Sequence, residues 1–147
     1  MPIAYITLDQ AIEIHAKTVA VSGGGTIGQL DVDKLGSVLE HIQNDDYYPE
    51  FADKLTHLLF AVCKFHCFVD GNKRIAIVLC AQMLLMNGYL FIAQTFLRDT
   101  ENISYHVAAG NIDKELLREF LQALLDGKAE EESLKLRLMH AMASQAD

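Results

Sequence analysis

The feature that most constrains the fold is an apolar run from Ile75 to Met86, which only Gln82 interrupts. The run is too short to cross a membrane, since a transmembrane helix needs about 20 apolar residues. A helix that is apolar on nearly all sides must instead be buried in a protein core. Asn87-Gly88 provides a suitable helix stop. The run therefore predicts a central buried helix around which the other elements pack.

The residues just before this run combine a turn with positive charge. Asp70-Gly71-Asn72 is a turn sequence, because glycine allows positive φ and Asp and Asn side chains bond to their own backbone. Lys73 and Arg74 follow at the expected helix start, where free N–H groups and the positive end of the helix dipole attract anions. Both side chains suit phosphate. We interpret this segment as a nucleotide-phosphate site.

Three side chains further upstream complete a candidate active site. His66 titrates near neutral pH and can act as a general base. Asp70 offers a hard oxygen ligand beside the expected phosphates, which is how Mg²⁺ is usually held. We interpret Phe68, between them, as the apolar anchor that fixes the loop to the core. Each side chain also fits an ordinary structural role on its own, but their combination within nine residues favours an active site.

Residues 66–74, H-C-F-V-D-G-N-K-R, resemble the motif of the Fic/Doc family, which is written H-x-F-x-[D/E]-G-N-[G/K]-R. Every specified position is met. The likeness extends more loosely over roughly Thr7 to Gly88, through the order and length of the expected helices. The resemblance implies an all-α fold, a Fic/Doc-like helical bundle around a central buried helix. It also implies a small β-hairpin flap, for which residues 26–30 are the candidates.

The resemblance further implies transfer of a phosphate-containing group from a nucleoside triphosphate, such as ATP, to a hydroxyl of a target protein. Carried over by position, His66 would deprotonate that hydroxyl and Asp70 would hold Mg²⁺ on the nucleotide. The residues that would cradle the phosphates are Gly71, Asn72, Lys73 and Arg74.

Two positions distinguish this chain from family members that transfer AMP. Those members commonly carry glycine where Lys73 stands, and a second arginine three residues after the first, where this chain has Ile77. The second arginine normally grips the terminal phosphate and leaves the α-phosphate at the acceptor. Its absence implies the opposite orientation, similar to Doc (death-on-curing) toxins, which are protein kinases. We therefore rank phosphoryl transfer above AMP transfer, with a non-catalytic nucleotide- or protein-binding helical module as a third alternative.

The resemblance also bears on regulation. The family's inhibitory signature is Ser or Thr, followed four residues later by Glu and then by Gly or Asn. None of the Ser or Thr residues in this chain fits that spacing. The resemblance therefore implies that any inhibitor is a separate antitoxin protein.

Bulk properties limit the location and the partners of the protein. A net charge of −8 argues against nucleic-acid binding, because phosphate neutralisation needs a basic surface. The first residues lack the basic part of a secretory signal, and Asp9 and Glu13 interrupt their apolar run. Cys63, Cys67 and Cys80 stand in apolar surroundings, which predicts buried thiols in a reducing cytoplasm. We expect a cytoplasmic protein that binds neither nucleic acid nor membranes.

The length of 147 residues predicts one domain, residues 1–147. A Thr7…Gln10 capping box predicts the start of the first helix. Further helices are expected at about 32–43, 51–65 and 98–109, and from a cap at Asn111 or Asp113 to Leu125. Tyr89–Ala93 is expected to be a short extended piece. An additional C-terminal helix of unknown role is expected within about 128–147.

Overall fold

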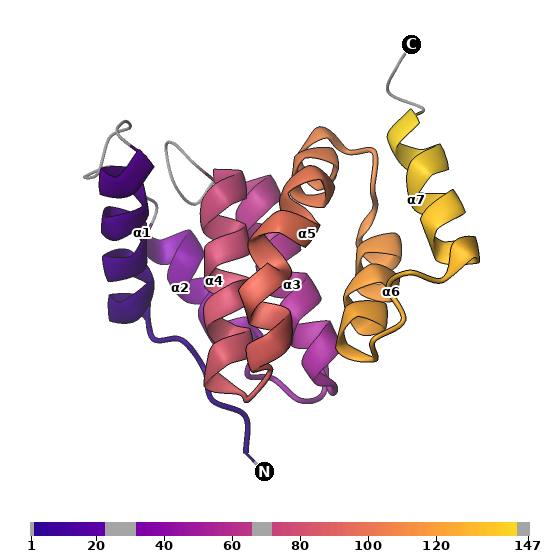
Figure 1. The fold of residues 1–147 in the computed structure, drawn as a ribbon. Coiled ribbons are helices and arrows are strands. Elements are labelled where there is room, and N and C mark those ends of the chain that lie inside the picture. The colour runs from indigo at the N-terminus through magenta and orange to yellow at the C-terminus, as the bar shows by residue number, and fades with distance from the viewer. Residues whose placement is uncertain (1, 23–31, 66–71, 144–147) are drawn as a thin grey trace.

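The computed structural model describes residues 2–22, 32–65 and 72–143, and in these segments the chain forms seven helices and no strand (Figure 1). The helices are α1 (Leu8–Ser22), α2 (Val32–His41), α3 (Phe51–Phe65), α4 (Asn72–Met86), α5 (Leu90–Ala109), α6 (Lys114–Leu125) and α7 (Glu132–Ala143). The prediction of an all-α fold is confirmed. Residues 26–30, the candidates for a β-hairpin flap, lie outside the described segments.

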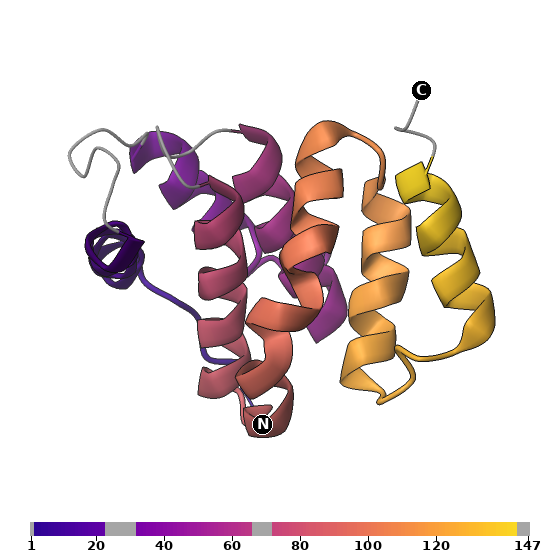
Figure 2. The ribbon, with the colours of Figure 1, turned by 45° about the horizontal axis from the view of Figure 1, so that its top comes forward.

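Helix α4 lies at the centre of the bundle, as its apolar sequence predicts. It packs against α1, α3 and α5. The views in Figures 1 and 2 place α1 and α2 on one side of the α3–α4–α5 layer, with α6 and then α7 on the other. The buried residues of α4 are Ile75, Ala76, Ile77, Leu79, Cys80, Met83 and Leu84.

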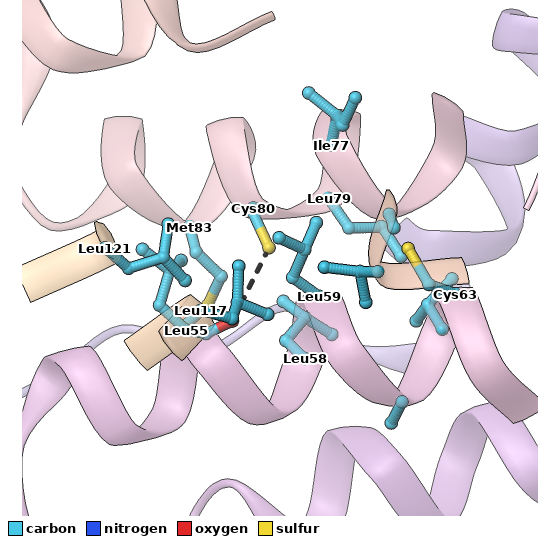
Figure 3. Packing of buried hydrophobic residues seen from close by; sticks show 14 of the residues in the cluster. Leu55, Leu58, Leu59, Cys63, Ile77, Leu79, Cys80, Met83, Leu117 and Leu121 are labelled. Atoms are coloured by element: carbon cyan, nitrogen blue, oxygen red, sulfur yellow. Dashed lines mark hydrogen bonds between the residues drawn. The ribbon is translucent and has the colours of Figure 1, made fainter. Parts of the chain in front are cut away.

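The contact between α3 and α4 is formed by buried apolar residues (Figure 3). Leucines of α3 and α6 meet the buried face of α4, and the Cys80 thiol donates to the Leu55 carbonyl oxygen at 3.7 Å. Burial raises the pKa of the Cys80 thiol well above its ordinary value, so this side chain is a protonated core residue. Cys63 is buried as well, as predicted, whereas Cys67 lies outside the described residues.

The predicted capping box at the start of α1 is present. Thr7 N donates to Gln10 Oε1 at 2.9 Å, and Gln10 N donates to Thr7 Oγ1 at 3.1 Å. The chain before it is tied to the end of α4, because Asn87 Oδ1 accepts from Ala4 N and Asn87 Nδ2 donates to Ala4 O. The N-terminal segment thus fastens the lower end of α4 in Figure 1.

Helix α4 ends as predicted in a Schellman turn at Gly88. Gly88 has φ 90°, Tyr89 N donates to Leu84 O at 2.9 Å, and Gly88 N donates to Leu85 O at 3.2 Å. Only a residue that accepts positive φ fits this position without strain.

The expectation of an extended piece at Tyr89–Ala93 is wrong, because α5 already begins at Leu90. The mixture of aromatic and apolar residues in this stretch resembles a strand locally. Over its full length, however, α5 buries one face at helical spacing: Ala93, Phe96, Thr100, Ile103, Ser104 and Val107. Burial of this long stripe against α3 and α4 outweighs the local preference.

The remaining elements agree with the expectations, with small corrections. Asp113, not Asn111, caps α6, because its carboxylate accepts from Leu116 N at 2.8 Å. Helix α7 begins at Glu132, after the predicted start of the C-terminal helix. It packs on α6, and its buried residues are Leu134 and Leu138.

Candidate phosphate site at the start of α4

Along the chain, the predicted active-site segment, residues 66–74, follows α3 and runs into the first turn of α4, and these two helices pack side by side. Helix α3 ends at Phe65 and α4 begins at Asn72. His66, Phe68, Asp70 and Gly71 lie outside the described residues, and their predicted roles stay predictions. Asn72, Lys73 and Arg74 form the first turn of α4, where the sequence placed them.

The first turn of α4 has the charge that an anion site requires. It contains no acidic residue, and it carries two cations, Lys73 and Arg74. The Arg74 side chain is exposed. The first N–H groups of an α-helix have no partner within the helix, and together with the helix dipole they add positive potential at such a start. These features fit the phosphates of a nucleotide.

The next turn of α4 adds no charge. Ile77 follows Arg74 by three residues and so lies on the same side of the helix. Its side chain is only 4% exposed, and in Figure 3 it points away from α3. Beyond Arg74, α4 carries no charged residue at all. The cationic part of this helix is therefore confined to its first turn.

The ends of three helices meet at this end of the molecule. The last turn of α3, the first turn of α4 and the last turn of α5 lie together at the top of both Figure 1 and Figure 2. The Cys63 thiol in the last turns of α3 donates to the Ser104 carbonyl oxygen of α5 at 3.9 Å. Sequence reasoning missed this contact, because nothing local links residues 41 positions apart.

A comparison with protein families decides the classification. A model of the Fic/DOC family matches residues 5–84, which is more than half of the chain. The chain belongs to the Fic/DOC family. Membership supports a Fic-type transferase as the broad class of activity. Neither the curated proteins nor the solved structures contain a significant match.

The Fic/DOC match agrees with the resemblance seen over roughly Thr7 to Gly88, and it includes the whole 66–74 motif. It ends two residues before the end of α4, so α5, α6 and α7 lie beyond it. Helix α5, which contacts the last turns of α3 through Cys63 and Ser104, therefore lies outside the part of this Fic/DOC protein that the family match covers.

Two further observations on this Fic/DOC protein concern metal binding and membrane spans. Among the described residues, no three His, Cys, Asp or Glu side chains are grouped so that they could hold a metal ion. Asp70, the expected Mg²⁺ ligand, is not among them. Within the same segments, no helix combines the length and the apolar character that crossing a membrane requires.

Proposed function

We propose that this Fic/DOC protein transfers the γ-phosphoryl group of a nucleoside triphosphate, such as ATP, to a Ser, Thr or Tyr hydroxyl of a target protein, as Doc-type toxins do. The observation that carries the proposal is the charge pattern of α4. Lys73 and Arg74 provide cations in the first turn, and a buried Ile77 occupies the place of a second arginine. Without that arginine to grip the terminal phosphate, the γ-phosphate is the one free to face the acceptor.

The proposed reaction is a direct displacement. The acceptor oxygen forms a bond to the γ-phosphorus, while the bond from that phosphorus to the β–γ bridging oxygen breaks. The hydroxyl proton passes to the imidazole of His66, and the nucleoside diphosphate leaves with the electron pair of the broken bond. His66 is two residues before Phe68, the proposed anchor of the loop.

The remaining motif residues bind and orient the nucleotide. The backbone N–H groups that open α4, together with Lys73 and Arg74, hold the phosphates and stabilise the charge that develops on them. Asp70 is the residue that would hold Mg²⁺, which when bound neutralises phosphate charge. Most of the catalysis then comes from positioning and electrostatics rather than covalent chemistry.

The proposed partners follow from the same reading. The net charge of −8 favours a target protein with a basic surface around the acceptor hydroxyl. Because the chain lacks the family's inhibitory signature, the proposed inhibitor is a separate antitoxin protein in the same cytoplasm.

The deciding experiment is a label-transfer assay. The full-length protein is incubated with cell lysate, Mg²⁺ and ATP labelled at either the α or the γ position. Phosphoryl transfer predicts γ-label in a target protein, with a mass increase of about 80 Da, whereas AMP transfer predicts α-label and about 329 Da. Nucleotide binding without transfer of either label would support the non-catalytic binding module instead.

His66→Ala tests the role of the base. Loss of a general base should lower the transfer rate by about a hundredfold or more, while circular dichroism and the melting temperature stay close to wild type. His140→Gln is the matched control, because His140 is exposed on α7. Full transfer by His66→Ala would contradict the mechanism.

A further inference from the structure

Helix α5 ends in a hydrogen-bonded turn at Gly110. Gly110 has φ 88° and closes a Schellman turn, in which Asn111 N donates to His106 O at 2.9 Å and Gly110 N donates to Val107 O at 3.1 Å. The side chains reinforce it, since Asn111 Nδ2 lies 3.0 Å from His106 Nδ1. The last carbonyl groups of a helix and its dipole favour a cation at such an end.

The side chain of Lys64 brings an ammonium group close to this helix end. Lys64 is half-buried in the last turn of α3, and a methyl group built on Gly110 would lie 3.7 Å from its Nζ. The preceding residue makes a second contact with the same helix, through the Cys63 thiol and the Ser104 carbonyl oxygen. Two consecutive residues of α3 therefore reach the last turns of α5.

Lys64 lies two residues before His66, the proposed base, so this contact is close in the chain to the proposed active site. Helix α3 ends at Phe65, and the proposed base, His66, is the next residue. Helix ends fray easily unless side chains hold them. An ammonium group near a helix C-terminus interacts favourably with the last carbonyl groups and with the helix dipole. The same contact restrains the helical turn that carries the lysine.

We propose that Lys64 is a positioning residue, whose ammonium group docks on the Gly110 end of α5 and so fixes the direction in which α3 delivers His66. The inference rests on the proposed function, because it assigns Lys64 to the support of that same base. It also gives α5, which lies beyond the family match, a part in the reaction.

The test compares Lys64→Met, which keeps the apolar stem, with Lys64→Arg, which keeps the charge. Misplacement of the base should lower kcat of Lys64→Met about tenfold or more. The nucleotide KM should stay within about twofold, since the phosphate-binding turn is untouched. Lys64→Arg should recover most of kcat, and Lys128→Met, at an exposed lysine, should behave as wild type. An unchanged kcat in Lys64→Met, or a raised KM with unchanged kcat, would overturn the proposal.

Amide hydrogen exchange gives a readout that does not need activity. In Lys64→Met, the amides of residues 61–65 should exchange about tenfold faster, with little change in α7. In the wild-type protein, the last turn of α3 should exchange more slowly than the last turn of α7. This second comparison holds even if a variant does not fold. Fast exchange at the end of wild-type α3 would refute the positioning role, whereas absence of γ-label transfer by the wild-type protein would refute only the proposed function.

Discussion

His57 Nδ1 lies 2.9 Å from Lys114 Nζ, so a buried histidine of α3 accepts a hydrogen bond from the ammonium group that opens α6. The imidazole stacks on the Tyr48 ring at a centroid distance of 4.7 Å. The same ammonium lies 5.5 Å from the centre of that ring and 5.7 Å from the centre of Phe60. This cluster joins the segment after α2 to both α3 and α6. Through this stacking, Tyr48 packs against α3.

The cluster predicts a loss of stability in mild acid. Burial, the Lys114 ammonium and the nearby His41 lower the pKa of His57 from 6.5 to about 4. Between these pH values His57 is mostly protonated in the unfolded chain but mostly neutral in the folded protein. The free energy of unfolding should therefore fall by up to about 1.4 kcal/mol for each pH unit below 6.5. Well above pH 6.5, where the imidazole is neutral in both the folded and the unfolded state, this histidine contributes no pH dependence.

His57→Gln isolates this effect, because glutamine still accepts a hydrogen bond from Lys114 but does not titrate. Urea unfolding at several pH values from 7 to 4.5, with roughly half-unit spacing, should show a shallower acid slope for the variant than for wild type. His140→Gln on the exposed face of α7 should leave the slope unchanged. Equal slopes in wild type and His57→Gln would show that His57 takes up its proton normally.

The hydrogen bonds of Lys54 should also make a measurable contribution to the free energy of unfolding. Its side chain is 0% exposed, and its Nζ donates to the Ile42 carbonyl oxygen at 2.9 Å and to Asp45 Oδ1 at 2.8 Å. Burial alone lowers the pKa of Lys54, but the hydrogen bond to Asp45 and the nearby Tyr5 outweigh it and raise the pKa. The stabilisation is therefore complete below pH 10.5 and is lost as the pH rises through the raised value.

Lys54→Met should lower the free energy of unfolding by about 2–3 kcal/mol, because it leaves the Ile42 carbonyl buried without its partner. Asp45→Asn is the matched variant: its side chain is largely exposed, so its cost should stay within about 1 kcal/mol. Chemical unfolding near neutral pH measures both. Equal costs for the two variants would mean that the carbonyl contact contributes little.

The residues at positions 73 and 77 of α4 should determine whether the γ-phosphoryl group or AMP is transferred. Replacing Lys73 by glycine and Ile77 by arginine introduces the pattern of AMP-transferring family members and should move label incorporation from the γ to the α position. Ile77 is buried, so the arginine stem must carry its charge toward the surface. Unaltered γ-label at the wild-type rate would mean that these two positions do not orient the nucleotide.

The control for this switch is Lys73→Gly combined with Ile77→Met, which has a long side chain but no charge. It should transfer γ-label only, at a reduced rate, because it lacks Lys73, one of the two cationic side chains proposed to bind the phosphates. Melting temperatures of both double variants separate a change of specificity from a loss of folding.

Local sequence patterns were sufficient for most of the fold. The Thr7 capping box and the Gly88 stop both follow from interactions between residues no more than five positions apart. Such interactions form in much the same way in any fold, so a pattern predicts them. Tyr89–Ala93 was misread because its helical state depends on the burial of a stripe that continues to Val107.

By itself, the sequence determined the buried central helix and the capped helix ends, since these depend on neighbours along the chain, and its resemblance to the Fic/Doc motif implied the all-α class. Only the tertiary structure decided that Lys114 contacts His57 and that Lys54 donates a hydrogen bond to the Ile42 carbonyl oxygen. It also decided that Lys64 lies close to Gly110. These partners are brought together by the way whole helices pack. The position of a charged residue or a hydrogen-bond donor in the sequence does not show which distant helix it will contact.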